Sequence, residues 1–199
     1  MQEFDFYYDF SSPNAYLVHK VLPGISARTG AVARYRPMFL GGVFKATGNA
    51  SPAFAGVTGK LDYLRREMDR FVRRHDVPFV WNPHFPIRSI HLMRGAIGAQ
   101  GKAWERAYIE AMFKACWVSG DNMSEFEVMA RELAAEDLPT AEIMAGIQQA
   151  EVKAALFAAT EAAVARGVFG APTMFVGEEM FFGKDSLVEM EAEIGARVS

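Results

Sequence analysis

The chain has 199 residues, enough for one well-buried domain or for a domain that carries a large insertion. Its formal net charge of −3 gives no reason to expect a nucleic acid or an anionic membrane as a partner. No apolar run approaches the roughly 20 residues of a membrane span, and the beginning of the chain lacks the basic and apolar segments of a signal peptide. We therefore expect a globular, cytoplasmic protein.

The number of cysteines and the spacing of the histidines predict neither dithiol redox chemistry nor a metal site. Cys116 is the single cysteine, so the chain can form neither an internal disulfide nor a Cys-x-x-Cys pair. It lies in an apolar, helical-looking segment, where a free cysteine is usually a small buried hydrophobe. The histidines, His19, His75, His84 and His91, do not have the spacing of metal ligands. We expect no metal site.

The first motif is a strand that runs into a helix. The alternating segment 4–10 predicts a strand, and the polar turn that follows it leads to Pro13. Proline is favoured at the first helical position because its missing N–H would have no partner there. Ser12 then becomes the N-cap, with its hydroxyl beside unpaired amides. Such turns hold anions and nucleophiles in α/β proteins, although most Ser-Pro pairs are only caps.

The middle of the chain is predicted to be helical. A helix over 13–29 and a strand over 31–37, parallel to the first, would make a βαβ unit. A Gly-rich loop over 41–51, a helix over 60–74 and an extended loop over 76–86 follow. Five further helices are expected at 89–100, 102–118, 124–136, 140–149 and 151–166.

The last part of the fold, from Pro172 onwards, is predicted from a second proline motif. Pro172 precedes an apolar run that is typical of a buried strand, and a strand tolerates proline at its first residue. Strands over 173–176 and 179–182 would form a hairpin around Gly177-Glu178, followed by a closing helix over 185–194. The chain thus has a βαβ unit, a helical middle and a ββα end.

The two proline motifs together resemble the two halves of a thioredoxin-type active site. The segment 6–17 reads Phe-Tyr-Tyr-Asp-Phe-Ser-Ser-Pro-Asn-Ala-Tyr-Leu, and 171–173 reads Ala-Pro-Thr. This pattern resembles the DsbA-like branch, and within it the kappa-class glutathione transferases and 2-hydroxychromene-2-carboxylate isomerases. The resemblance implies an α/β, thioredoxin-like fold with a large all-helical insertion. Residues 1–38 and 167–199 would form the thioredoxin-like domain, and 39–166 the helical insertion with connecting loops.

The resemblance also implies a glutathione site. Ser12 would take the place of the redox cysteine and hold the glutathione thiolate as the catalytic residue, with Ser11 as its closest competitor. The main chain of Ala171, before a cis Pro172, would pair with the glutathione backbone. The remaining contacts would come from Asn49, Lys60, Lys184, Asp185 and Ser186. In the family an acidic residue at the position of Asp185 receives the γ-glutamyl ammonium.

Several of these residues also have an alternative, purely structural interpretation. Gly48-Asn49 is also typical of a turn. Lys60 is also typical of a solvated cation at the beginning of a helix, and Asp185 of an N-cap for the last helix. The kappa enzymes have Ser-Asp-Arg where this chain has Lys184-Asp185-Ser186. The chain thus keeps the acidic residue, Asp185, and differs from the kappa enzymes at both of its neighbours.

A second substrate is expected between the thioredoxin layer and the insertion, because binding sites favour domain interfaces. The aromatic and polar loop that contains Asn82, His84, Phe85 and Arg88 resembles a loop of the family at this place. A small aromatic carboxylate would suit a mixed pocket, with Arg88 as its anion partner.

The resemblance implies three alternative functions. The first is a glutathione-dependent isomerase that opens an aromatic hemiketal carboxylate to a trans-benzylidenepyruvate through a transient glutathione adduct. The second is a kappa-type transferase that acts on small electrophiles, and the third is a redox-inactive thioredoxin-like binding module. A homodimer is the commonest assembly in general.

Overall fold

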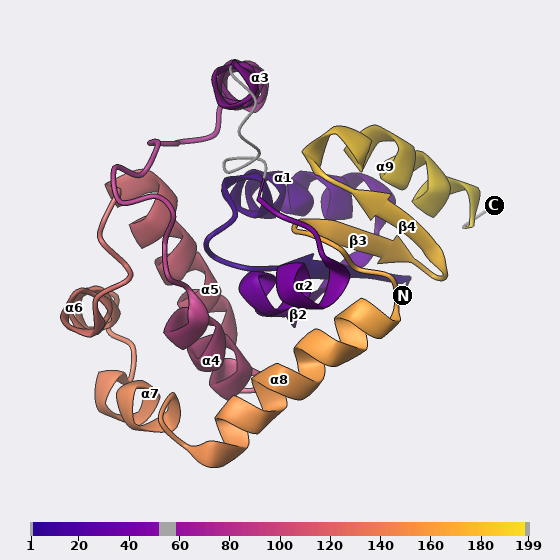
Figure 1. The fold of residues 1–199 in the computed structure, drawn as a ribbon. Coiled ribbons are helices and arrows are strands. Elements are labelled where there is room, and N and C mark those ends of the chain that lie inside the picture. Colours follow the sequence, from indigo (N-terminus) through magenta and orange to yellow (C-terminus); the bar gives the residue numbers. More distant parts are fainter. Residues whose placement is uncertain (1, 52–58, 198–199) are drawn as a thin grey trace.

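The computed structural model describes residues 2–51 and 59–197 (Figure 1). Four strands form one sheet in the order β2-β1-β3-β4. The first strand, β1 (Glu3–Tyr8), is parallel to β2 (Val32–Pro37) and antiparallel to β3 (Thr173–Val176), which pairs antiparallel with β4 (Glu179–Phe182). The predicted βαβ unit and the predicted hairpin are therefore confirmed.

Side-chain alternation along β1 explains how the sheet is covered on both faces. Phe4, Phe6 and Tyr8 are buried in the core that includes α1 (Pro13–Thr29) and α9 (Leu187–Ala196). Asp5 and Tyr7 point to the opposite face, where both contact Arg166. Figure 1 shows α1 and α9 on one side of the sheet, with α8 (Ala150–Ala165) crossing the other side.

The predicted helical middle of the chain is confirmed. It begins with α3 (Lys60–His75), which stands above the other helices in Figure 1. The helices α4 (Ile90–Ala99), α5 (Glu105–Lys114), α6 (Phe126–Ala135) and α7 (Thr140–Gly146) gather on the side away from α9. The extended loop between α3 and α4 is also present. The predicted division into domains stays a prediction; α8, the last helix of the predicted insertion, packs against β2.

The predicted Gly-rich loop over 41–51 is wrong, because a short helix, α2 (Leu40–Thr47), occupies most of it. Packing outweighs the poor helix propensity of two glycines there. Val43 is fully buried against Met38 and Val168. A Cβ at Gly42 would lie 3.1 Å from Thr160 Cγ2, so the missing side chain lets α2 lie close to α8. Gly48, with φ 69°, ends the helix in the left-handed conformation.

Several other predicted boundaries differ from the structure. The first strand ends at Tyr8 instead of residue 10. The predicted helix over 102–118 begins at Glu105 and changes at Ala115 into a π-helical turn, η2 (Ala115–Ser119). The last helix begins at Leu187, after a 3₁₀ turn, η3 (Lys184–Ser186), so Asp185 is not its N-cap.

The described residues contain neither a membrane-spanning helix nor a cluster of metal ligands. None of their helices is both long and apolar enough to cross a membrane. No group of three or more histidine, cysteine or acidic side chains in 2–51 and 59–197 is arranged to hold a metal ion.

Candidate active site

The beginning of α1 provides the first part of the site. Ser12 is its N-cap, and the Ser12 hydroxyl accepts a hydrogen bond from Ala15 N at 3.2 Å. The same hydroxyl donates to the carbonyl oxygen of Ala171 at 3.1 Å. Ser12 is only 5% exposed, so its Oγ lies in a largely desolvated position beside the positive end of the helix dipole. This position suits a partly buried anion.

The loop before β3 provides the second part. The Ala171–Pro172 peptide bond is cis, as predicted. Thr173 Oγ1 donates to Gly170 O at 2.8 Å, and Gly183 N donates to Pro172 O at 3.0 Å, so the loop is fixed on both sides. Within the described chain, the Ala171 N–H has no hydrogen-bond partner. That amide is a free donor directly beside Ser12.

A buried carboxylate behind Ser12 was missed by the sequence analysis. Asp9 is fully buried, and its Oδ1 accepts from both the amide and the hydroxyl of Ser11 at 2.8 Å. Its Oδ2 accepts from Leu40 N, at the beginning of α2, at 2.8 Å, and the Ser89 hydroxyl also bonds this carboxylate. Burial raises the pKa of Asp9, and these hydrogen bonds oppose the increase. Asp9 thereby connects the Ser11-Ser12 turn to α2 and to the residue before α4.

Two further contacts hold this turn against the helical part of the molecule. Trp117 Nε1 donates to Phe10 O at 2.8 Å, and Phe10 N lies 3.4 Å from the sulfur of Met93. Phe10 and Trp117 are fully buried. Because Trp117 lies in the π-helical turn η2, that irregular turn is part of the scaffold behind the site.

Asn49 and Lys60 flank a segment, 52–58, that lies outside the described residues. The Asn49 side-chain amide donates to Phe169 O at 2.9 Å, which links the end of α2 to the loop that contains Ala171. Lys60 is the exposed first residue of α3. The structure thus places Asn49 next to the proline loop, and the predicted role of Lys60 stays a prediction.

The turn η3 forms a charged cluster with α3. The Lys184 ammonium is buried and bonds the carboxylates of Glu67 and Asp185, the latter at 2.8 Å. The Asp185 side chain is 71% exposed, so its second face is open to a ligand. One ammonium against two carboxylates leaves a net negative charge, which suits the ammonium group of a ligand. The Ser186 hydroxyl donates to Gly183 O at 2.9 Å within the turn.

Asn82 has a structural role in the loop between α3 and α4. It is 1% exposed, and its amide donates to Cys116 O at 2.8 Å and to Asp121 O at 2.9 Å. Its oxygen accepts from His84 N at 2.8 Å. Because both N–H groups of Asn82 are used inside the protein, its predicted contact with a substrate is replaced by an indirect role, the positioning of the loop.

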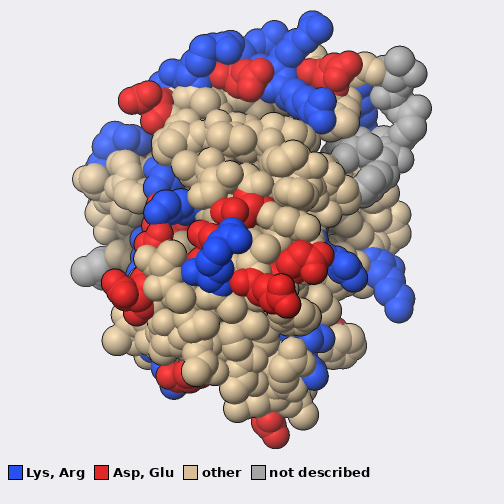
Figure 2. Space-filling model, turned by 90° about the vertical axis from the view of Figure 1, so that its left-hand side faces the viewer, with Lys and Arg blue, Asp and Glu red and all other residues tan. Residues whose placement is uncertain are grey.

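The same loop forms an aromatic wall made of Phe79, Trp81 and Phe85, all of them half-buried. Phe79 is stacked on Trp117, with ring centroids 5.9 Å apart, and the Arg65 guanidinium lies 4.6 Å from the Trp81 centroid. Figure 2 shows the charges of α3 along the top of this side and a wide uncharged surface below them. His84 and Arg88, which the sequence analysis had singled out, are exposed on the same loop.

Cys116 is fully buried, as predicted. Burial, together with the charges of Asp9 and Asp121, holds the pKa of its thiol well above the usual range. Cys116 is therefore no nucleophile, and a thiol for this site would have to come from a bound molecule.

The residues around Ser12 fit glutathione. A peptide-like ligand needs main-chain donors and acceptors, and Ala171 has a free N–H and a carbonyl oxygen whose present donor is the Ser12 hydroxyl. The negative cluster at Asp185 suits an ammonium group, and the beginning of α1 suits a thiolate. The Asn49 side chain bonds the loop that contains Ala171, and the Lys184 side chain bonds Asp185 within the turn η3.

Comparisons with known proteins show the family to which the chain belongs. A family model described as DSBA-like thioredoxin domain matches residues 3–195. The chain is 31% identical over 193 residues to a 2-hydroxychromene-2-carboxylate isomerase of Pseudomonas putida, and the match covers 96% of this chain and 93% of that protein. A solved structure of 2-hydroxychromene-2-carboxylate isomerase superimposes with a TM-score of 0.88 at 28% identity, covering 98% of this chain and 96% of that one.

A shorter match is to glutathione S-transferase kappa 1 of Caenorhabditis elegans, with 32% identity over 82 residues, 41% of this chain and 35% of that protein. The fold defines a thioredoxin-type protein, and its site has a serine, Ser12, at the beginning of α1 and no Cys-x-x-Cys pair. The chain belongs to the DSBA-like thioredoxin family and, within it, to the family of 2-hydroxychromene-2-carboxylate isomerases. It is therefore a member of a family of isomerase enzymes.

Proposed function

We propose that the protein is a glutathione-dependent isomerase of an aromatic hydroxychromene-type carboxylate. The observation that carries this proposal is the position of Ser12, a nearly buried hydroxyl at the beginning of α1, 3.1 Å from the carbonyl oxygen of Ala171. A serine at this position can donate a hydrogen bond to sulfur but cannot form a disulfide. The site is thus suited to hold a thiolate and unsuited to dithiol exchange.

When bound, glutathione supplies a thiolate that adds to an electrophilic carbon of the substrate and later leaves, so that a double bond can change its geometry. The chain's own contribution is to hold that thiolate. The Ser12 hydroxyl and the positive end of α1 lower the thiol pKa, because both stabilise the charged form. Ala171 would bind the peptide backbone and Asp185 the ammonium, while Lys60 would face a carboxylate.

The second substrate is proposed to lie on the aromatic wall of Phe79, Trp81 and Phe85. This wall borders the turn that carries Ser12, because Trp117 contacts Phe79 and also bonds Phe10 O. Arg65 over Trp81 places a cation beside the rings, which favours an aromatic acid over a neutral aromatic. Arg88, exposed on the same loop, is a second cation for the carboxylate.

The decisive experiment is to incubate 2-hydroxychromene-2-carboxylate with the protein, with and without glutathione, and to follow the ring-opened product by its absorbance. Product should form faster than the background only when protein and glutathione are both present. S-methylglutathione is the matched control, since it keeps the backbone but has no free thiol. Equal turnover with S-methylglutathione would contradict the proposal.

Kappa-type transfer of glutathione to electrophiles is the second candidate, and the partial match to a kappa-class transferase favours it. Product analysis separates the two functions, because a transferase consumes glutathione whereas the isomerase regenerates it. A binding module would show neither reaction. Glutathione binding can be measured independently: at one hundred times its dissociation constant, a ligand stabilises the folded protein by about 2.7 kcal/mol.

A further inference from the structure

We propose that the cavity between α2, α4 and α8 is a second binding site, which takes a small amphipathic carboxylate. Its volume is about 460 Å³, within the range of roughly 300–1,000 Å³ that is usual for small-molecule sites. Neither Ser12 nor Pro172 lines it, so it is separate from the proposed glutathione cleft. This inference does not depend on the proposed function.

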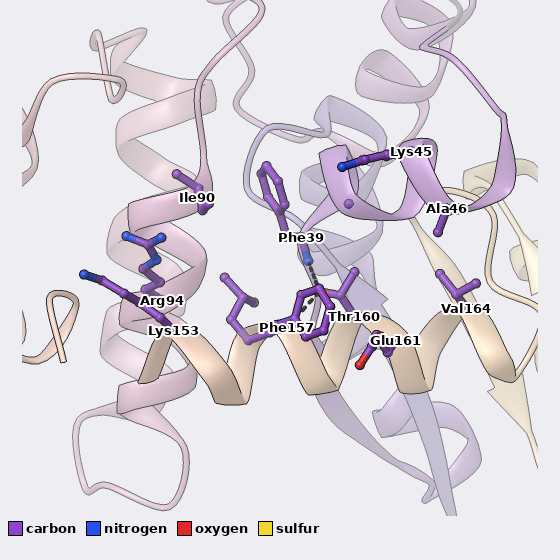
Figure 3. Close-up of a pocket in the computed structure, with 12 residues that line it drawn as sticks. Phe39, Lys45, Ala46, Ile90, Arg94, Lys153, Phe157, Thr160, Glu161 and Val164 are labelled. Atoms are coloured by element: carbon purple, nitrogen blue, oxygen red, sulfur yellow. Dashed lines mark hydrogen bonds between the residues drawn. The ribbon is translucent and has the colours of Figure 1, made fainter. Parts of the chain in front are cut away.

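The body of the cavity is apolar. Figure 3 shows Phe157 and Phe39 facing each other across it, with Ile90 at one end and Val164 towards the other. Phe157 is 65% exposed, an unusual state for a large apolar side chain that borders a cavity. A ligand whose apolar part lies between the two rings would remove this surface from water.

One end of the cavity is cationic. Arg94 of α4 and Lys153 of α8 lie at the same end in Figure 3, and Lys45 of α2 borders the rim. The Nε atom of Arg94 is buried and has no hydrogen-bond partner. In the part of the chain that the structure describes, no ion pair involves any of these three cations. A buried donor without a partner is costly, and a carboxylate would satisfy it.

The position of Glu161, an acid that lines the cavity, predicts how a ligand would be oriented in it. Glu161 lies eight residues after Lys153 on α8, which corresponds to about 12 Å along the helix axis. A carboxylate is therefore favoured at the Arg94 end and disfavoured at the Glu161 end. An aromatic acid of two rings has the length and polarity to place its charge near Arg94 and its rings beside Phe157.

The test uses 2-naphthoate as the probe and calorimetric titration of the full chain. The acid should bind at least about tenfold more tightly than naphthalene-2-carboxamide, because only the acid forms charge-assisted bonds. Arg94→Gln and Lys153→Gln should each weaken the binding of the acid and leave that of the amide unchanged. Arg70→Gln is the matched control, since Arg70 is an exposed arginine of α3 outside the cavity.

Two further measurements keep the proposal falsifiable if Arg94→Gln fails to fold. Ala46→Phe, at an exposed position of α2 that lines the cavity, should block the binding of the acid in this cavity, without affecting binding at the aromatic wall, while the protein stays folded. Saturating glutathione should leave the affinity for 2-naphthoate unchanged. Equal affinity for acid and amide, unchanged binding to Ala46→Phe, or full competition by glutathione would each overturn the proposal. So would self-association in sedimentation experiments that Phe157→Ala abolishes, since this face would then be covered by a second copy.

Discussion

The Ser12 hydroxyl donates a hydrogen bond to the carbonyl oxygen of Ala171, a residue 159 positions later in the chain. Because Ser12 also accepts from Ala15 N, its one proton is directed at the backbone with which glutathione is proposed to pair. A ligand N–H that bonds Ala171 O would compete for that oxygen and free the hydroxyl to turn towards sulfur. Backbone pairing and thiolate stabilisation would then be coupled through one carbonyl group.

The first prediction concerns Ser12→Ala. The loss of an N-cap hydroxyl costs about 1 kcal/mol of stability, whereas a hydrogen bond to a charged group is worth roughly 1.5–3 kcal/mol. We therefore expect a folded protein whose glutathione-dependent turnover falls about ten- to hundred-fold. The pKa of the bound thiol, measured from thiolate absorbance, should rise. Ser11→Ala is the control and should do much less; a Ser12→Ala protein with full turnover would refute the assignment.

The second prediction concerns Asp9→Asn. An amide has only one acceptor oxygen, so it can serve either Ser11 or Leu40 but not both sets of donors. Leaving a buried donor without a partner costs about 1–3 kcal/mol, and urea denaturation should show a loss of that size. Asp69→Asn, at an exposed position of α3, should leave the free energy of unfolding unchanged. Equal stability of the two variants would show that the carboxylate does not organise the site.

A third prediction separates binding from chemistry at the rim of the cleft. Asp185→Ala and Lys60→Ala should each weaken glutathione binding about two- to fivefold, the effect expected of exposed charges. Turnover at saturating glutathione should change less, because these side chains would hold parts of glutathione that do not react. Calorimetry and steady-state rates check this, with Glu189→Ala, an exposed acid of α9, as the control. A loss of saturated turnover with unchanged affinity would contradict the assignment.

The fourth prediction is the pH dependence of stability, which follows from a hydrogen-bonded relay that joins the buried side chains of Tyr35 and His19 to the exposed carboxylate of Glu110. His19 Nδ1 lies 2.8 Å from the Tyr35 hydroxyl, and its Nε2 lies 2.7 Å from Glu110 Oε2. Burial lowers the pKa of His19, and the hydrogen bond from His19 is the main cause that lowers the pKa of Glu110 to about 2. Both groups bind protons less readily in the folded than in the unfolded protein. Their stabilisation is therefore lost as pH falls, first for His19 and then for Glu110.

Glu110→Gln isolates the second part of this effect. The variant should be less stable than the wild type at neutral pH, and the difference should shrink as pH falls from 4.5 towards 2, the window between the unfolded and folded pKa of Glu110. Urea denaturation at a series of pH values measures it. Glu127→Gln, an exposed acid of α6, should show no such trend. A difference between wild type and Glu110→Gln that does not depend on pH would rule out the relay.

Local signals predicted the parts of the site that depend on a few neighbouring residues. Pro13 fixes its own φ angle, and the Ser12 side chain reaches an amide three residues later, so the beginning of α1 is encoded in four residues. The alternation of β1 likewise predicted its buried face. The pairing of Ser12 with Pro172 came from a family pattern and was confirmed by the contact with Ala171.

Long-range contacts explain two features that the sequence did not predict, the helix α2 and the environment of Asp185. The segment 41–51 looked like a loop because its glycines disfavour a helix, yet Gly42 is what lets α2 approach Thr160. Asp185 looked like a cap for the last helix, but Lys184 holds its carboxylate in a cluster with Glu67, more than one hundred residues earlier.

The α1 turn, the helical middle, the hairpin and the absence of a dithiol could all be predicted from the sequence, since each follows from propensities, spacing or composition. The sequence did not predict that Asp9 joins the Ser11-Ser12 turn to α2 and to the residue before α4, or that Arg94 and Lys153 line one cavity; both depend on long-range folding. The physical reason is that the free energy of a buried charge depends on which donors surround it. Those donors come from segments that only the folded chain brings together.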